Sequence, residues 1–274
     1  MKVYETGNIR NVVVMGHGGC GKTTLVEAIA YQTGITARMG KVTDGNTISD
    51  YDKEEQKRQF SISTSVVPVE FEDIKINFLD TPGYFDFVGE VEEACHAAGA
   101  AVIVINGKSG VEVGTLKAWE LCEKYKLPRL FFVTGMDDDQ ASYRKIVLEL
   151  NDRFGRKVAP FHVPIRENEK FVGFVNVVKM KGRRFINDTS EYEECDIPDY
   201  MDKHLNISRD ALVEAVADTS EELMERYFAG EEFTYEEVST ALRTHVMDCQ
   251  IVPVLVGSGI HNQGTSMLMN VIKK

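Results

Sequence analysis

The feature that most constrains this chain is a glycine-rich stretch, GHGGCGKT, at residues 16–23. It follows the short apolar run Val12–Met15, which is typical of a buried strand, and precedes residues 23–32, which have a helical pattern. The spacing fits GxxxxGK[ST], in which backbone N–H groups and a helix N-terminus surround phosphate oxygens. A glycine-rich turn without a ligand is the alternative, but the strand before it and the helix after it favour a P-loop. The sequence therefore predicts that the chain binds a nucleoside phosphate.

Within this loop two side chains have expected roles. Lys22 is expected to reach the β- and γ-phosphates, and the Thr23 hydroxyl to bind Mg²⁺. The residues predicted to surround the phosphates are Gly16, His17, Gly18, Gly19, Cys20, Gly21, Lys22, Thr23 and Thr24. Cys20 is read as a small residue filling a variable position, with redox sensitivity as the alternative.

A second motif, DTPG at Asp80 to Gly83, directly follows an apolar run that ends at Leu79. By itself DTPG could equally be an ordinary turn. Some sixty residues after a P-loop, however, its carboxylate can hold Mg²⁺ through water, and the Gly83 amide can donate to a γ-phosphate. We expect Asp80, Thr81, Pro82, Gly83 and Tyr84 to line the nucleotide site.

Two further stretches follow apolar runs and bear on the choice of base. TGMD begins after the run Leu130–Val133, and GSG begins after Val252–Val256. A carboxylate at Asp137 could accept from guanine N1 and N2, and a GSG amide could donate to O6, although Asp137 also opens an acidic run that could be a solvated helix start. Ligands gather at the carboxyl ends of parallel strands, so the two stretches can converge. The residues predicted to contact a guanine base are Thr134, Gly135, Met136, Asp137, Gly257, Ser258 and Gly259.

The order of strand-like and helical patterns predicts an α/β fold, a P-loop NTPase domain whose sheet is mostly parallel and flanked by helices. Residues 40–60 are polar without clear periodicity and predict a long functional loop. From residue 158 the rhythm changes to strands over 158–165, 171–180 and 184–187 and helices over 200–205, 209–229 and 234–247. We expect residues 1–157 and 251–274 to form the P-loop domain and residues 158–250 to form an inserted α+β subdomain.

Charge and composition limit the remaining classes. The net charge is −12, and residues 158–250 hold 20 acidic and 10 basic residues, so the acidity sits in the expected insert. Such a surface disfavours nucleic-acid phosphates and favours a basic partner, although solubility alone could explain it.

The longest uncharged apolar run, Ala97–Ile105, is too short to span a membrane, and the N-terminus has no signal-peptide pattern. Five scattered cysteines fit a reducing cytoplasm. His245 and Cys249 alone do not make a metal site.

Together these motifs resemble the translational GTPases, and among them elongation factor G. GHGGCGKTT is similar to the family's GHxDxGKTT, DTPGYFDF to DTPGHVDF, EEQKRQFSIS to its switch I segment EQERGITIT, and GSGIHNQG to GSAFKNKG. PIRENEKFVGFVNVVKMK and EELMERYFAGEEFTYEEV resemble parts of the G′ subdomain that elongation factor G carries inside its GTPase domain. The resemblance covers essentially the whole chain and implies GTP or GDP with Mg²⁺ as ligands. It also implies the ribosome as partner, with the insert touching the stalk protein. It further implies that the chain is one domain of a longer factor. As a fragment the chain is expected to be monomeric.

Several departures from the family pattern bear on catalysis. Tyr84 stands where the family has the His that orients the hydrolytic water, and Gly18 and Phe60 replace its apolar gate. The P-loop Asp is Gly19, and Thr134 and Gly135 replace the Asn and Lys of NKxD, whose Lys covers the guanine. Ser61 stands for the Thr that binds Mg²⁺, so the expected metal-binding residues are Thr23, Ser61 and, through water, Asp80.

These departures leave the activity open between two hypotheses. The first is a slow GTP hydrolase that the ribosome completes, with Lys22, Gly83 and Tyr84 as catalytic residues. The second is a ribosome-binding module that holds GTP with little turnover because of Tyr84. An unrelated P-loop ATPase or kinase is a third alternative.

Overall fold

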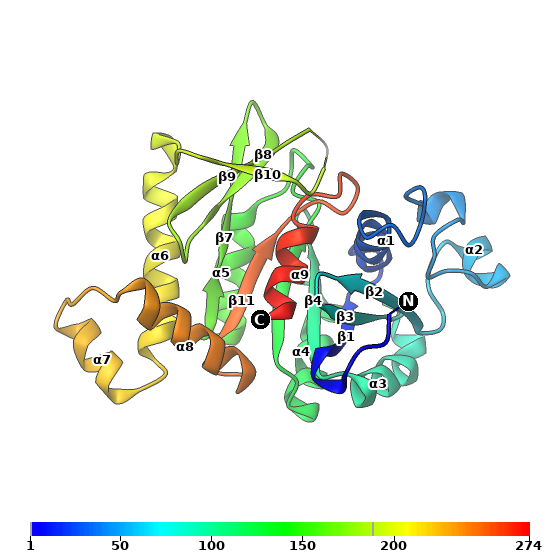
Figure 1. The fold of residues 1–274 in the computed structure, drawn as a ribbon, viewed down its shortest axis with the longest axis horizontal. Coiled ribbons are helices and arrows are strands. Elements are labelled where there is room, and N and C mark those ends of the chain that lie inside the picture. Colours follow the sequence, from blue (N-terminus) through cyan, green and yellow to red (C-terminus); the bar gives the residue numbers. More distant parts are fainter. Residues whose placement is uncertain (1, 188) are drawn as a thin grey trace.

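The computed structural model describes residues 2–187 and 189–274 of the chain. Its large sheet has seven strands in the order β2-β3-β1-β4-β5-β11-β6 (Figure 1). The strands are β1 (Ile9–Gly16), β2 (Ser65–Phe71), β3 (Ile74–Asp80), β4 (Ala100–Asn106), β5 (Arg129–Thr134), β6 (Val158–Pro160) and β11 (Val252–Val256). Every neighbouring pair is parallel except the antiparallel hairpin β2–β3.

Helices cover both faces of this sheet, and the strand sequences show why. In β4, Ile103 and Ile105 belong to one buried cluster while Val102 and Val104 belong to the other. Strands buried on both faces need continuous apolar runs, which is what the central strands contain. One face is covered by α1 (Lys22–Gln32) and α9 (Thr265–Lys273), and the other by α3 (Val88–Ala97), α4 (Val113–Tyr125) and α5 (Tyr143–Phe154).

A second, four-stranded antiparallel sheet has the order β10-β9-β8-β7. Its strands are β7 (His162–Glu167), β8 (Lys170–Asn176), β9 (Lys181–Phe185) and β10 (Tyr192–Cys195). The strand expected over 158–165 is thus two strands, since β6 pairs with β11 in the large sheet and β7 opens the small one. Only Phe161 separates them, and its N–H donates to the Val254 carbonyl while its carbonyl accepts from Val177.

The helices that follow the small sheet are α6 (Asp202–Ala217), α7 (Glu221–Phe228) and α8 (Tyr235–Met247). The helix expected over 209–229 is wrong in its limits: α6 begins earlier, and the chain turns at Asp218 to Ser220 before α7. Ser220 explains the break, because its hydroxyl accepts the N–H of Leu223 as an N-cap.

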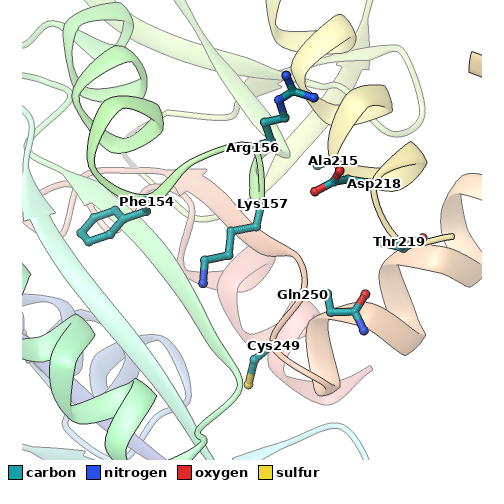
Figure 2. Close-up of a pocket in the computed structure, with 8 residues that line it drawn as sticks. All are labelled: Phe154, Arg156, Lys157, Ala215, Asp218, Thr219, Cys249 and Gln250. Carbon is teal, nitrogen blue, oxygen red and sulfur yellow. The ribbon is translucent and has the colours of Figure 1, made fainter. Parts of the chain in front are cut away.

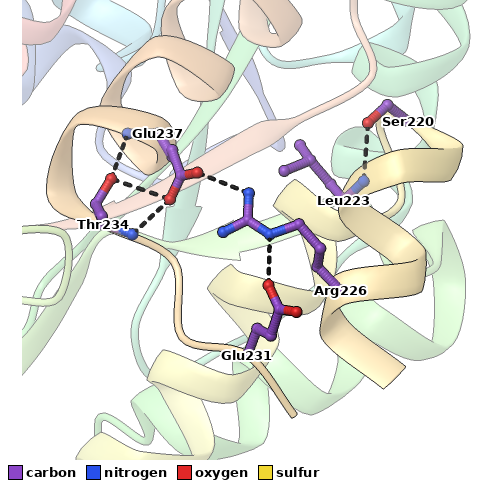
Figure 3. A network of polar contacts seen from close by, with 6 residues as sticks. All are labelled: Ser220, Leu223, Arg226, Glu231, Thr234 and Glu237. Carbon is purple, nitrogen blue, oxygen red and sulfur yellow. Dashed lines mark hydrogen bonds and ion pairs between the residues drawn. The ribbon is translucent and has the colours of Figure 1, made fainter. Parts of the chain in front are cut away.

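Arg226 ties α7 to α8, as Figure 3 shows. Its guanidinium donates to Glu231 at 3.0 Å and to Glu237 at 2.7 Å, and Glu237 completes a capping box with Thr234. In Figure 1 these three helices lie at the end of the molecule opposite α1 and α2 (Lys53–Arg58). The acidic helices α6, α7 and α8 therefore lie at the end of the molecule away from the P-loop helix (Figure 1).

The structure confirms the expected fold class of a mostly parallel sheet flanked by helices, with an antiparallel sheet added. The division of the chain into domains at residues 158 and 250 stays a prediction. Short 3₁₀ helices occur at Thr6–Asn8, Val42–Asp44, Phe85–Phe87 and Asp199–Met201. Over residues 2–187 and 189–274, none of the helices has the length and apolar character required to cross a bilayer.

Candidate nucleotide site

The glycine-rich loop joins β1 to α1, as the sequence predicts, and its glycines have structural reasons. Gly16, Gly19 and Gly21 have φ of 147°, 76° and 100°, backbone conformations that residues other than glycine rarely adopt. A Cβ on Gly16 would also run into the Val104 carbonyl and lie 2.8 Å from the Cys20 sulfur. The loop is thus a tightly folded backbone turn at the N-terminus of a helix, the geometry that attracts phosphate.

Lys22 places its ammonium group inside this turn. The side chain is 6% exposed, and Nζ donates to the carbonyls of Gly16 at 3.2 Å and His17 at 2.9 Å. Cys20 is buried as well, and burial raises the pKa of its thiol, which disfavours the reactive thiolate.

The DTPG stretch lies against the P-loop. Thr81 anchors it by donating its hydroxyl to the Val14 carbonyl at 2.7 Å. A Cβ on Gly83 would lie 2.7 Å from the Gly18 Cα and run into Lys22 Nζ. This close approach explains the glycine at position 83, and it keeps the Gly83 backbone beside the ammonium of Lys22.

Asp80 is the buried acid at the centre of the site. It is 1% exposed, and neither carboxylate oxygen has a partner at hydrogen-bond distance. Burial raises its pKa to about 6, although Lys22 and, more weakly, the hydroxyls of Ser49 and Thr23 lower it. An ionisable oxygen pair buried without partners is the kind of group that a bound cation satisfies.

A chain of oxygens continues from the P-loop into the loop before β2. Thr23 Oγ1 lies 3.1 Å from Ser61 Oγ, which donates to Asp50 Oδ1 at 2.7 Å. Asp50 Oδ2 and Ser49 Oγ are buried without a partner, and burial raises the pKa of Asp50. Hydroxyl and carboxylate oxygens are the ligands that Mg²⁺ prefers, with phosphates supplying the rest of its coordination. These residues therefore fit the predicted metal.

Sequence reasoning did not find the residues that position Ser61. Glu27, which is 1% exposed on α1, accepts the N–H groups of Gly40 and Ile48 at 2.7 Å each. Glu55 accepts those of Ile62 and Ser63 at 2.9 and 3.1 Å. Asp50 and Glu55 lie in a stretch without periodicity, whereas Glu27 lies within α1. The available signal was Glu27 itself, a charged residue among the apolar residues of a buried helix.

The predicted base-binding residues also come together. β5 and β11 are parallel neighbours, so the stretches that follow them leave the sheet at the same edge. The Met136 N–H donates to the Gly257 carbonyl at 3.2 Å, and the Gly259 N–H to Thr134 Oγ1 at 3.3 Å. A Cβ on Gly259 would be 3.2 Å from the Thr24 side chain, which places these loops beside the P-loop. Asp137 Oδ1 is buried without a partner.

Tyr84 lies over the P-loop and is 46% exposed. A Cβ on Gly18 would be 3.3 to 3.5 Å from three carbons of the Tyr84 ring. The ring also packs on Phe60 with a centroid distance of 4.6 Å. Tyr84, which stands where the family has His, thus contacts both residues that replace the family's apolar gate, Gly18 and Phe60.

A separate cavity of about 400 Å³ lies where α5 leads into β6 and the chain returns to β11. Figure 2 shows Lys157, Asp218, Cys249 and Gln250 around it. It lies at the amino ends of β6 and β11, so it is at the sheet edge opposite the P-loop. None of the predicted site residues lines it.

The residues 2–187 and 189–274 contain no group of three or more His, Cys, Asp or Glu side chains arranged to hold a metal. His245 Nδ1 lies 3.0 Å from a carboxylate oxygen of Asp248.

A strand, a glycine turn with a buried lysine and a helix, with a DTPG carboxylate beside them, define a P-loop nucleotide-binding domain of the GTPase kind. The sequence model of the elongation factor Tu GTP-binding domain matches residues 7–274, and the chain belongs to this family. The resemblance to translational GTPases is therefore confirmed. The individual roles of the site residues stay predictions.

A solved structure supports the same family. A crystal structure of a protein from Thermus thermophilus matches this chain with a TM-score of 0.88 and 36% sequence identity. The match covers 97% of this chain and 40% of the Thermus chain. The chain thus spans less than half the length of this relative.

Proposed function

We propose that this chain is the GTP-binding and GTP-hydrolysing domain of an elongation factor G-like ribosomal translation factor. The observation that carries the proposal is the convergence of Lys22, Asp80 and Ser61 with the loops after β5 and β11 at one edge of the sheet. The antiparallel sheet and acidic helices within the chain favour the elongation factor G branch, whose GTPase domain they resemble.

In this proposal each group has a defined task. The P-loop N–H groups and the Lys22 ammonium stabilise phosphate charge, and the Gly83 N–H donates to the γ-phosphate. Thr23 and Ser61 would hold Mg²⁺ directly, and Asp80 would hold it through water. The bound ion supplies charge neutralisation between the phosphates.

The same contacts provide a switch. Loss of the γ-phosphate removes the partner of Gly83 and weakens the hold on Ser61. Residues 40–64 are then attached to the rest of the domain mainly through Glu27 on α1 and Glu90 on α3. Such ordering and release of a loop is the usual signal of GTPases.

The proposed partner is the ribosome, and the proposed setting is the cytoplasm. Residues 158–250 hold 20 acidic and 10 basic residues, which suits a basic protein surface better than nucleic acid. By resemblance that surface is the ribosomal stalk protein. The domain itself is proposed to be monomeric.

The packing of Tyr84 favours a second candidate, a ribosome-binding module that holds GTP with little turnover. The ring rests on Gly18 and Phe60, and a phenol hydroxyl is a poorer general base for a hydrolytic water than the imidazole it replaces. In that case the nucleotide would control binding without being consumed quickly.

Single-turnover GTP hydrolysis by the complete protein, with and without ribosomes, separates the two candidates. A large stimulation by ribosomes supports the hydrolase, and no stimulation eliminates it. Tyr84→His then assigns the cause if it restores turnover. Phe85→His is the matched control, because Phe85 is the exposed neighbour, 49% accessible, and no role is proposed for it.

Nucleotide selectivity tests the guanine assignment. GDP should bind much more tightly than ADP, and Asp137→Asn should weaken GDP and favour xanthosine diphosphate, whose ring presents an acceptor to the new amide. Equal binding of GDP and ADP would instead support an unrelated P-loop ATPase or kinase.

A further inference from the structure

His261 lies in a small closed loop after β11, in the part of the candidate site that is predicted to contact the guanine base. Ser258 and Gln263 close this loop by exchanging two backbone hydrogen bonds of 2.9 Å each. The His261 N–H donates to Ser258 Oγ at 3.3 Å, so the residue is held by its own loop. A short loop closed at both ends fixes the direction in which its outer residue projects.

The imidazole of His261 faces the carboxylate of Asp137. His261 Nε2 and Asp137 Oδ2 are 3.8 Å apart, and the side chains are 40% and 26% exposed. The other oxygen, Asp137 Oδ1, is buried without a hydrogen-bond partner. One oxygen of the carboxylate therefore has the His261 imidazole as its neighbour, while the other has no hydrogen-bond partner among the described residues.

The rest of the TGMD stretch offers little that could hold this carboxylate or the base. Gly135 has φ of 68° and no side chain, and around its position the nearest atoms to a Cβ are 3.6 Å or more away. Met136 is fully buried, and Thr134 Oγ1 is engaged with Gly259. A side chain from the loop after β11 is therefore the group best placed to complete the part of the site that contacts the base.

We propose that His261 is a positioning residue for base selection, which orients Asp137 so that its carboxylate accepts the N1 and N2 protons of guanine. The proposal rests on the proposed guanine recognition by Asp137. A side chain on the β11 loop then supplies part of the selectivity that the stretch after β5 lacks, because a carboxylate discriminates between bases only when its direction is fixed.

The test compares GDP with inosine diphosphate, which lacks the 2-amino group, by calorimetric titration of the complete protein with Mg²⁺. His261→Ala should weaken GDP binding about 5- to 10-fold and weaken inosine diphosphate less, so that the preference for GDP falls. His261→Gln keeps a donor at similar reach and should restore most of the preference.

Ile260→Ala is the matched control in the same loop, because Ile260 is 62% exposed. It should leave both affinities unchanged, and if it reproduces the effect of His261→Ala, the effect comes from the loop and the proposal is refuted. If His261→Ala keeps the wild-type preference for GDP over inosine diphosphate, the proposal is also refuted. If Asp137→Asn fails to shift preference from GDP to xanthosine diphosphate, guanine recognition by Asp137 is wrong and both proposals fall. If that shift occurs while His261→Ala is silent, only the role of His261 is wrong.

Discussion

Asp80 offers a quantitative test of the site, because an ionised carboxylate is buried there without partners. Burial raises its pKa from 3.8 to about 6 in the protein without ligands. A difference of about 2 pKa units corresponds to about 3 kcal/mol at 1.36 kcal/mol per unit. At neutral pH the ionised Asp80 therefore destabilises the ligand-free fold by up to about 3 kcal/mol.

The sign follows from proton linkage. Between pH 3.8 and about 6 the folded protein keeps a proton on Asp80 that the unfolded chain releases. The contribution of this residue to stability consequently falls as pH rises through that window and is constant above it. Asn has no charge to bury, so Asp80→Asn should stabilise the ligand-free protein at pH 7.5 by about 1 to 3 kcal/mol, since part of the gain is lost to the buried amide.

Urea unfolding in EDTA without nucleotide, from pH 4 to pH 7.5, measures this difference. The gain of Asp80→Asn over wild type should be small near pH 4 and reach its full value above pH 6.5. Asp86→Asn is the control, because Asp86 is exposed, and it should change nothing.

Excess Mg²⁺ and GDP should then reverse the order of stability. Wild type should gain about 4.1 kcal/mol at a ligand concentration of about 1,000 times the dissociation constant, which exceeds the advantage of the variant. The variant should gain much less, since it lacks the carboxylate proposed to hold the ion. A variant less stable than wild type at pH 7.5 in EDTA would refute the reasoning about Asp80.

Three further predictions concern other parts of the molecule. Gly83→Ala should weaken GTP binding at least 10-fold in a titration, because its methyl group would meet Lys22 Nζ and the Gly18 backbone, whereas Gly89→Ala, with open space around it, should not. Arg226→Gln should raise the pKa of Glu237 from about 2 toward 4.5 in an NMR titration and lower the thermal stability at neutral pH, with the loss shrinking as the pH falls from 4.5 toward 2. Trp119→Ala should lower the free energy of unfolding by about 3 kcal/mol in urea, because Trp119 stacks on Phe154 at 4.0 Å and under the Arg129 guanidinium at 3.9 Å; a loss below about 1 kcal/mol would contradict this packing argument.

The parts of the site that follow strands could be predicted from the sequence. Gly16, Asp80, Asp137 and Gly257 each end or follow an apolar run, and a parallel sheet brings such positions to one edge. Their convergence needed only the strand order.

The loop before β2 could not be predicted in the same way. Asp50 and Glu55 act through backbone N–H groups and a neighbouring hydroxyl, and such contacts leave no periodicity in the sequence. The helix α2 that carries Glu55 is only six residues long, begins with an Asp52 capping box and contains no apolar residue, so it has no hydrophobic periodicity to detect.

The helix boundary near residue 218 was missed for a related reason. Residues 209–229 keep a helical pattern throughout, and the break depends on one serine cap at Ser220. His261 was missed because its partner Asp137 lies more than a hundred residues away in the sequence, and only the pairing of β5 with β11 joins them.

The direct passage from β6 through Phe161 into β7 has a consequence for protein engineering. β6 forms the outer edge of the large sheet, and it covers β11, whose five residues are all buried. A shortened version that deletes residues 158–250 would remove β6 and leave β11 as an apolar edge strand with unpaired backbone groups, a known cause of aggregation. A minimal version of the chain should therefore keep residues 158–161 and rejoin the backbone beyond them.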